Sequence, residues 1–299
     1  MKIFITGAGG FMGSRISEYL SRRGHETFDY IRSRDGNLSP DKIPENIDVI
    51  VNSAGRLGVR GVHTDELTLS NASLPGVLAD HCSRLNVHLI HISTPGVTGL
   101  LINASEDSEY NPPGDYESSK LAGETALRKH EYLRADLLTV LRPDFVYGPG
   151  DLHKLALFKQ ISKGWIPLIG KNGARIRPTF AEDVCRAVEC SLPGGILCGG
   201  LFNIAGPETV TIRELSGVIA SALGRTLRFI PLPRIFFRMA LNLGALCPEA
   251  LSESRFRLFG EDHFVSTLKA EKAGFHAEWD IKNGISETVS WYLNNGVLT

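Results

Sequence analysis

The segment YESSK holds two side chains, Tyr116 and Lys120, whose types and spacing could do chemistry. On a helix that runs to about residue 130, they lie one turn apart on the same face. A free tyrosine titrates near pH ~10, but a nearby cation, together with a positively charged nicotinamide, favours the phenolate and lowers its pKa. Tyr116 could then take a proton from a substrate hydroxyl as a hydride leaves the adjacent carbon. The alternative is a solvent-facing tyrosine and lysine on an ordinary helix.

Thr94 is the hydroxyl that we expect to hold the substrate oxygen during that step. It ends the run VHLIHIST, residues 87–94, whose apolar pattern predicts a strand that is covered on both faces. In open α/β sheets, ligands bind at the carboxyl ends of the strands. The pattern therefore predicts that Thr94 lies at the substrate site.

The N-terminal segment IFITGAGGFMG, residues 3–13, predicts the cofactor site. An apolar run, three glycines and a helical pattern indicate a strand, a turn and a helix. Gly7 permits the turn, Gly10 lets the backbone approach a pyrophosphate, and Gly13 lets the helix pack close to the strand. The first N–H groups of that helix, around Phe11 and Met12, would face the phosphates. These three spaced glycines are also compatible with an ordinary tight loop.

The end of the second expected strand, residues 25–31, favours NADP over NAD. An acidic residue there would bind the ribose 2′-hydroxyl, whereas an arginine accommodates a 2′-phosphate. Arg32 follows the strand, and the nearest carboxylate, Asp29, comes two positions too early. Arg32 is therefore the candidate phosphate clamp, and NAD stays possible. A solvated loop that carries Arg32 and Arg34 is the alternative.

Further segments complete the expected α/β fold, a doubly wound parallel sheet. Between residues 31 and 48 the chain is too short for a full crossover helix and a third strand, so we expect a loop with a stub strand around Leu38. The run DVIVNSAG, residues 48–55, predicts a buried strand whose last residues, Ser53, Ala54 and Gly55, pass close to the cofactor. A helix is expected over residues 67–85.

The composition limits the function classes. The chain has 32 basic and 33 acidic residues and a net charge of −1, without a like-charged block, so nucleic acid is not an expected partner. Five cysteines without a CxxC or Cys/His spacing predict reduced thiols, and no metal site is expected. The first strand leaves no room for a signal peptide and no membrane span is expected, so a cytoplasmic location is predicted. The apolar stretch 229–246 predicts an amphipathic helix at a pocket rim.

In this combination the segments resemble the extended short-chain dehydrogenase/reductase superfamily, of the NAD(P)-dependent epimerase/dehydratase type. The resemblance runs almost end to end and keeps the order of the family's motifs. The matching pieces are TGAGGFMG (6–13), DVIVNSAG (48–55), Asn71, HISTPGVTG (91–99), YESSK (116–120), LRPDFVYGPGD (141–151), RIRPTFAEDV (175–184), FNIAGPETVTIREL (202–215) and GISETVSWYLNNG (284–296).

The resemblance implies a Rossmann-type fold and a role for each matching position. Thr94 would donate a hydrogen bond to the substrate oxygen, Tyr116 would be the general acid/base, and Lys120 would lower its pKa and hold the nicotinamide ribose. Asn71 matches a structural or relay asparagine. Three residues would pass near the nicotinamide: Pro143, Phe145 and Val146. A homodimer is implied, through a four-helix bundle of the helices that carry Asn71 and Tyr116.

One departure from the family pattern concerns the substrate. Sugar-nucleotide members place an arginine, for the diphosphate, at the position of Ile176, which here lies between Arg175 and Arg177. Both arginines are therefore candidate substrate contacts. The spacing is closer to the branch that includes hydroxysteroid-dehydrogenase-like and flavonol-reductase-like members. The expected division is a dinucleotide-binding domain of residues 1–152 and 178–206, and a substrate-binding lobe of residues 153–177 and 207–299.

These residues favour an NAD(P)-dependent oxidoreductase or epimerase, acting by hydride transfer at a secondary alcohol or ketone carbon of a small molecule. We expect that molecule to be a nucleotide sugar, with a sterol or phenolic substrate as the alternative. A third hypothesis, of another class, is a regulator that binds the dinucleotide without turnover. The intact set of Thr94, Tyr116 and Lys120 argues against it.

Overall fold

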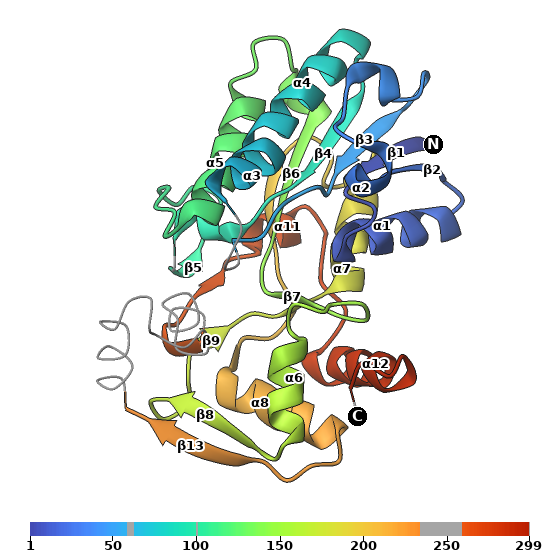
Figure 1. The fold of residues 1–299 in the computed structure, drawn as a ribbon. Helices are drawn as coiled ribbons and strands as arrows, with labels where there is room; N and C mark the ends of the chain where they lie inside the picture. The colour runs from blue at the N-terminus through green and yellow to red at the C-terminus, as the bar shows by residue number, and fades with distance from the viewer. Residues whose placement is uncertain (59–62, 100, 234–258, 299) are drawn as a thin grey trace.

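In the part of the chain that the computed structural model describes, residues 1–58, 63–99, 101–233 and 259–298, the main feature is a parallel sheet of six strands (Figure 1). The strand order is β11-β6-β4-β3-β1-β2. The strands are β1 (Lys2–Thr6), β2 (Glu26–Tyr30), β3 (Val49–Asn52), β4 (His88–Ile92), β6 (Leu138–Pro143) and β11 (Leu201–Ile204). Every neighbouring pair is parallel. The predicted doubly wound sheet is confirmed. Strands β2, β3 and β4 are two to four residues shorter than predicted, and β1 extends one residue beyond the predicted run at each end.

Helices cover both faces of this sheet because successive strand residues point to opposite sides. Ile3 and Ile5 pack in one apolar cluster with α1 (Phe11–Arg22) and α7 (Ala181–Cys190). Phe4, between them, packs in another cluster with α4 (Leu74–Leu85) and α5 (Asp115–Arg128). Figure 1 shows the two pairs of helices on opposite sides of the strands. Because all six strands run in the same direction, their carboxyl ends meet at one edge of the sheet.

The segment between β2 and β3 is short, as predicted, but the predicted stub strand around Leu38 is wrong. The described residues there form only the short helices α2 (Arg32–Asp35) and η1 (Pro40–Lys42). Side chains donate hydrogen bonds to the backbone carbonyl groups that a neighbouring strand would otherwise pair with. Lys42 Nζ donates to the carbonyl oxygens of Asp35 and Asn37, and the Tyr30 hydroxyl donates to that of Gly36.

The helix predicted over residues 67–85 begins earlier and is not uniform. It consists of α3 (Thr64–Leu67), a π-helical turn η2 (Thr68–Ser73) and α4. Pro75 supplies a physical reason, because it has no N–H to donate to the carbonyl of Asn71 four residues earlier. The α-helical pattern cannot continue there, and a wider turn replaces it.

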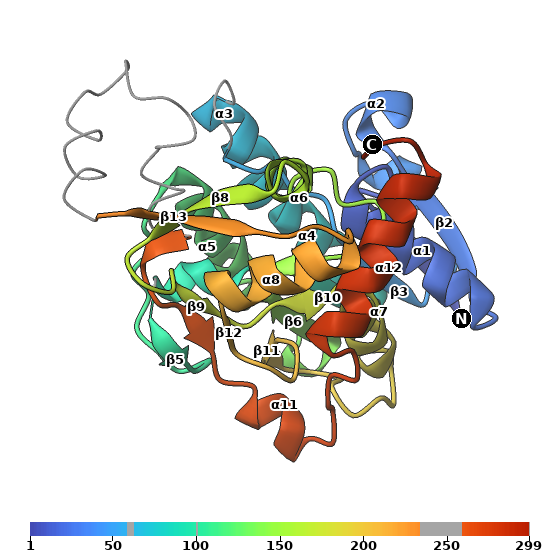
Figure 2. The ribbon, with the colours of Figure 1, turned by 90° about the horizontal axis from the view of Figure 1, so that it is seen from below.

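A second group of elements surrounds its own apolar cluster below the sheet in Figure 1. These are α6 (Leu155–Ser162), β8 (Trp165–Ile169), α8 (Ile212–Ala222), β13 (Arg228–Leu232) and α12 (Ile281–Asn294). Helices α8 and α12 lie side by side in Figure 2 and contact each other. Two small sheets join this group to the rest, β7 (Val146–Tyr147) with β10 (Thr179–Phe180) and β9 (Arg175–Ile176) with β12 (Val210–Thr211).

The amphipathic helix predicted over residues 229–246 is wrong where the structure describes it. Residues 228–232 form β13, which pairs in parallel with β8 and so satisfies its backbone in a sheet. The rest of that prediction, from residue 234 onward, lies outside the described residues.

A C-terminal segment returns to the main sheet. Strand β14 (Phe264–Val265) pairs with β5 (Ile102–Ala104), and α11 (Leu268–Lys272) contacts β11. Ala270 and Phe275 pack in the same cluster as Ile3 and Ile5. This segment therefore borders the carboxyl edge of the sheet.

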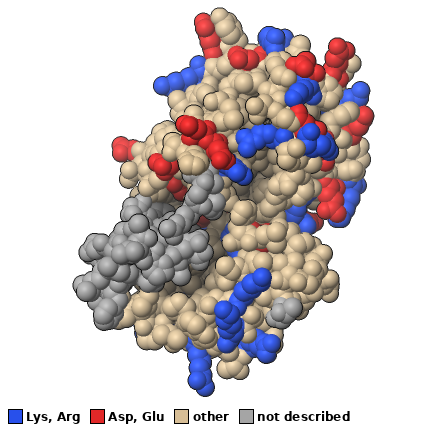
Figure 3. All heavy atoms as spheres, in the orientation of Figure 1, with Lys and Arg blue, Asp and Glu red and all other residues tan. Residues whose placement is uncertain are grey.

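On the face shown in Figure 3, positive and negative side chains are interspersed over the upper part of the molecule. None of the described helices is long and apolar enough to cross a membrane. Within the described residues, no group of three or more His, Cys, Asp or Glu side chains could hold a metal ion. The four described cysteines are free thiols: Cys82, Cys185, Cys190 and Cys198.

Candidate active site

The glycine turn between β1 and α1 leaves no room for side chains at two positions. A Cβ on Gly13 would lie 2.1 Å from the carbonyl oxygen of Gly7, and a Cβ on Gly7 would lie 2.6 Å from Cα of Ala54. Gly7 also has a φ of 73°, which favours glycine. Gly10 precedes α1 without a side-chain cap, so the first N–H groups of the helix are available to phosphate oxygens. This cradle fits the pyrophosphate of a dinucleotide.

A pocket of about 310 Å³ opens beside this turn, at the carboxyl ends of β1, β2 and β3. Six predicted cofactor residues line it: Gly7, Gly10, Arg32, Ser53, Ala54 and Gly55. Two other predicted residues, Phe11 and Met12, lie in the first turn of α1 outside this lining, and Met12 packs on the apolar cluster that contains Ile3 and Ile5. The pocket thus extends from the glycine turn toward the end of β2, where the adenosine end of a dinucleotide binds.

Arg32 enters this pocket from the start of α2. Its Nη1 donates to Ser70 Oγ at 3.0 Å, and Ser70 lines the same pocket. Arg56 lines it too, and its described lining contains neither Asp nor Glu. Arg34, by contrast, is bound to Asp35 and to the carbonyl oxygen of Asp29. The end of β2 therefore presents positive charge to the cofactor pocket.

Asn71 is fully buried in the π-helical turn η2 and joins two parts of the site. Its Oδ1 accepts from the N–H of Arg56 at 2.8 Å, and its Nδ2 donates to the Arg56 carbonyl oxygen and to Ser119 Oγ, both at 2.9 Å. Ser119 in turn donates to the carbonyl oxygen of Tyr116. Asn71 therefore fastens the loop after β3 to the first turns of α5.

Lys120 is buried on α5, one turn after Tyr116. Its Nζ donates to the Ile92 carbonyl oxygen at 2.6 Å and would lie 3.8 Å from a Cβ on Gly55. Burial lowers the pKa of Lys120 to about 8, and the nearby Glu124 opposes this change. The ammonium group thus borders the cofactor pocket.

Tyr116 is half-buried, and a Cβ on Gly58 would lie 2.9 Å from its Cβ. Burial raises the pKa of Tyr116, and the charge of Glu117 raises it further. The lowering that the sequence predicts is therefore not supplied by the protein groups alone. A positive charge from bound cofactor would have to add to that of Lys120.

Thr94 follows β4 and caps the short helix η3 (Pro95–Thr98), where its Oγ1 accepts from the N–H of Gly96 at 3.3 Å. It lines a second pocket, of about 180 Å³, together with Glu117, Pro143 and Phe145. Phe145 has a φ of 35°, a strained conformation for this residue type. Val146 starts β7, and its carbonyl oxygen accepts from Lys154. The predicted substrate residue and the predicted nicotinamide-side loop thus share one pocket.

Arg175 and Arg177 do not line the pocket of Thr94. Arg175 binds Asp262 at 2.8 Å and lies over the ring of Phe264, which does line it. Arg177 donates to the Gly206 carbonyl oxygen and to Thr267, and it lines a separate pocket beside α11. Both guanidinium groups are committed to the protein itself in this structure.

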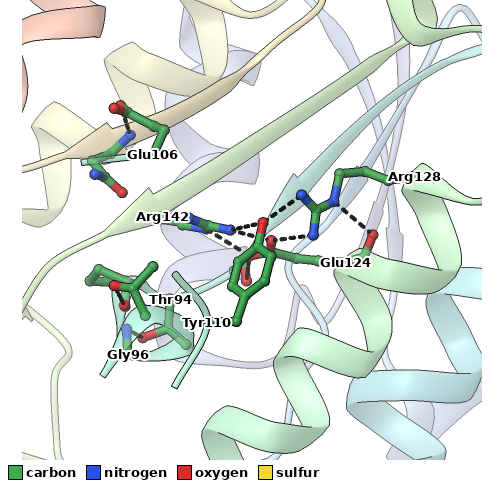
Figure 4. A network of polar contacts seen from close by, with 11 residues as sticks. Thr94, Gly96, Glu106, Tyr110, Glu124, Arg128 and Arg142 are labelled. Carbon is green, nitrogen blue, oxygen red and sulfur yellow. Dashed lines mark hydrogen bonds and ion pairs between the residues drawn. The ribbon is translucent and has the colours of Figure 1, made fainter. Parts of the chain in front are cut away.

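A buried ion pair that we did not predict lies behind Thr94 (Figure 4). Glu124 of α5 accepts from Arg142 Nε at 2.9 Å and from Nη2 at 2.6 Å, and both side chains are fully buried. Ser93, next to Thr94, donates to the same carboxylate at 2.5 Å. The signal in the sequence was Arg142 itself, because an arginine within an apolar strand requires a buried partner. The pair connects β4, α5 and β6 behind the site.

A parallel, doubly wound sheet with a glycine cradle, an adjoining pocket and a buried lysine beside it defines a dinucleotide-binding enzyme of the Rossmann type. The model of the NAD dependent epimerase/dehydratase family matches residues 3–205, more than half of the chain. The chain belongs to this family, and its cofactor is an NAD(P) dinucleotide. The predicted family is confirmed.

Relatives of known activity include reductases. The chain is 25% identical over 278 residues to a 2-alkyl-3-oxoalkanoate reductase of Stenotrophomonas maltophilia, an alignment that covers 83% of the chain and 82% of the relative. It is 33% identical over 207 residues to a dTDP-4-dehydrorhamnose reductase of Mycobacterium tuberculosis, an alignment that covers 65% of the chain and 67% of the relative. The fold matches a UDP-glucuronic acid 4-epimerase of Bacillus cereus in complex with NAD, with a TM-score of 0.76, 20% identity and 98% and 99% coverage.

Proposed function

We propose that this enzyme is an NADP-preferring oxidoreductase or epimerase that acts by hydride transfer at a secondary alcohol or ketone carbon of a nucleotide sugar. Tyr116 is the general acid/base, Thr94 holds the reacting oxygen, and Lys120 binds the nicotinamide ribose. Asn71 positions the loop after β3 against α5. The substrate-binding lobe is formed by residues 153–177 and 207–299, apart from the segment of β14 and α11 that packs on the main sheet.

One observation carries this proposal: the first turns of α5 border both pockets. Lys120 lies against Gly55, which lines the cofactor pocket. Glu117, one turn earlier, lines the pocket of Thr94. Tyr116 precedes Glu117, at the beginning of α5. A side chain there can exchange a proton with a substrate that is bound between Thr94 and the cofactor.

The chemistry divides between cofactor and protein. The bound dinucleotide gives or accepts the hydride. Thr94 donates a hydrogen bond to the substrate oxygen, and Tyr116 gives or takes the proton on that oxygen. Lys120, with a pKa lowered to about 8 by burial, keeps its charge at neutral pH and stabilises a developing phenolate.

Two relatives support a nucleotide-sugar substrate. One is the dTDP-4-dehydrorhamnose reductase of Mycobacterium tuberculosis, at 33% identity. The other is a probable low-salt glycan biosynthesis reductase of Haloferax volcanii, at 28% identity. The second candidate is a reductase of apolar ketones, the class of the sterol or phenolic alternative. It is favoured by the 2-alkyl-3-oxoalkanoate reductase relative and by the apolar lining residues Leu101, Phe145 and Phe264.

The matched pair Tyr116→Phe and Tyr132→Phe tests the proposal. Binding is first measured as a thermal shift with NAD and NADP, and then with UDP- and dTDP-sugars or 3-oxo acids in the cofactor-saturated protein. On the accepted substrate, Tyr116→Phe is expected to lower turnover by about 10²-fold or more, the usual contribution of a general acid/base, and to leave cofactor affinity within several-fold. Tyr132 is exposed, so its variant should match the wild type. Unchanged turnover in Tyr116→Phe rules out the assigned base.

A further inference from the structure

Asp144 places a carboxyl group at the pocket that Thr94 lines. Strands β4 and β6 pair with Ile92 opposite Leu141, so Thr94 and Pro143 follow at the same level, and Asp144 comes next. Its N–H donates to the Ile204 carbonyl oxygen at 2.9 Å, and its own carbonyl oxygen accepts from Thr179 Oγ1. Two neighbouring elements therefore fix the backbone from which this carboxyl projects.

The carboxyl of Asp144 is buried and incompletely satisfied. The residue is 6% exposed and lines the pocket of about 180 Å³. Among the described residues, its Oδ2 has no hydrogen-bond partner. A buried oxygen without a partner is costly and calls for an explanation, such as a bound water or ion or a role in function. Burial raises the pKa of Asp144 to about 7, and the N–H groups of Phe145 and Val265 and the charges of Arg177 and Lys154 only partly oppose this change.

The charged groups that the structure describes around the pocket offer no cation to an anionic substrate group. Its described lining holds two acidic residues, Glu117 and Asp144, and neither Lys nor Arg. Lys154 is bound to Asp151 and to the Val146 carbonyl oxygen, and Arg177 is bound to Thr267 and to the Gly206 carbonyl oxygen.

His263, which also lines the pocket, does not supply positive charge. Its Nδ1 lies 2.8 Å from the carbonyl oxygen of Glu261. A carbonyl oxygen only accepts, so Nδ1 carries the proton, and Nε2 of the neutral ring is an acceptor. Burial lowers the pKa of His263 and thereby favours this neutral form.

We propose that Asp144 contacts the substrate and determines specificity: it hydrogen-bonds an uncharged oxygen substituent near the reacting carbon and excludes a carboxylate there. This inference rests on the proposed function of the Thr94 pocket. A protonated Asp144 donates to a carbonyl or hydroxyl oxygen, and an ionised one accepts from a hydroxyl. An ionised Asp144 repels a substrate carboxylate, since the described lining of the pocket holds no Lys or Arg to compensate. The discrimination should therefore increase as the pH rises through 7.

The test compares UDP-glucose with UDP-glucuronic acid, in which a carboxylate replaces the hydroxymethyl group on C5, the neighbour of the C4 carbon. Dissociation constants are measured by calorimetry in the NADP-saturated protein at pH 6 and pH 8. At pH 8 the wild type should bind UDP-glucose at least about tenfold more tightly than UDP-glucuronic acid, because like charges in contact cost several kcal/mol. At pH 6 this preference should be smaller. Asp144→Asn should reduce the preference to within about threefold at both pH values.

Asp107→Asn is the matched control, since Asp107 is exposed in the loop after β5, and it should retain the wild-type preference. If Asp144→Asn also retains it, the proposal is overturned. If neither UDP-sugar binds while NADP still does, the nucleotide-sugar function fails. Asp144 is then tested by turnover of ethyl acetoacetate against acetoacetate, an uncharged and an anionic ketone. The assignment of Asp144 is overturned if the wild type prefers neither UDP-glucose over UDP-glucuronic acid nor ethyl acetoacetate over acetoacetate.

Discussion

Arg32 and Arg34 are the same residue type two positions apart, but they make different contacts. Arg32 lines the cofactor pocket and contacts Ser70, whereas Arg34 is bound to Asp35 outside it. The order of residues could not separate them, because both follow the same strand. At the scale of single residues, contacts rather than residue types decide which of the two charges lies in this pocket.

Arg32→Ala is expected to weaken NADP binding by about 10- to 100-fold and NAD binding by less than about threefold. The reason is the loss of a charge-assisted hydrogen bond to the 2′-phosphate, worth about 1.5–3 kcal/mol. Dissociation constants for both cofactors, by calorimetry, provide the measurement. Arg34→Ala is the control and should change neither constant. Equal losses for the two cofactors in Arg32→Ala would contradict the NADP preference.

The raised pKa of Asp144 also predicts how stability depends on pH. With a folded pKa of about 7, against 3.8 ordinarily, the native state holds a proton that the unfolded state has lost between those values. Asp144 thus makes the free energy of unfolding fall as the pH rises toward 7. Between pH 5 and pH 8, Asp144→Asn should gain on the order of 2–3 kcal/mol relative to wild type. Urea unfolding of the cofactor-free protein at several pH values measures this. If the free energies of unfolding of the two proteins depend on pH in the same way, the pKa of Asp144 is not raised.

The packing of η2 against α5 decides where Asn71, Tyr116 and Lys120 lie at the scale of elements. A Cβ on Gly123 of α5 would lie 2.1 Å from the Asn71 carbonyl oxygen, so the two elements approach as closely as glycine allows. That carbonyl is the one that Pro75 cannot engage in an α-helical bond. The π-helical turn, Pro75 and Gly123 together allow α5 to pack closely beside the loop after β3.

Gly123→Ala should therefore force η2 and α5 apart, with a loss of about 1–3 kcal/mol in the free energy of unfolding and a fall in turnover. The matched change is Gly217→Ala in α8, where nothing lies within 4 Å of an added Cβ. It should stabilise the protein by up to about 1 kcal/mol, because alanine favours a helix over glycine. Chemical denaturation of both variants gives the comparison. Equal effects of the two would show that the contact with Asn71 is unimportant.

At the scale of the whole molecule, α4 and α5 cover one face of the sheet and present their outer sides away from it (Figure 1). Ala122, in the middle of α5, is exposed. The homodimer implied by the family resemblance, which we propose forms through a four-helix bundle of these helices, would bury this surface. A long charged side chain at its centre is incompatible with such packing.

Ala122→Arg is accordingly expected to convert a dimer into a monomer, as measured by light scattering after size-exclusion chromatography. Ala222→Arg, at an exposed alanine in the last turn of α8, is the control and should remain dimeric. A monomeric wild type, or a dimer that tolerates Ala122→Arg, would place any interface elsewhere.

The sequence by itself determined the parallel sheet, the glycine turn and the family, because these depend on local patterns. Apolar runs, glycine spacing and alternating elements are legible along the chain. It also identified Tyr116, Lys120 and Thr94 as candidates, since short motifs carry them. Their joint role remains a prediction.

Only the tertiary structure decided which residues from distant segments meet. Glu124 and Arg142 are 18 positions apart and pair behind Thr94, and His263 reaches the same pocket from the C-terminal part. The rise in the pKa of Asp144 comes from burial, which depends on every element packed around it. The π-helical turn likewise escaped prediction, because its apolar pattern continues that of an ordinary helix. Three-dimensional proximity and solvent exclusion have no local signature, so these features of the site had to come from the fold.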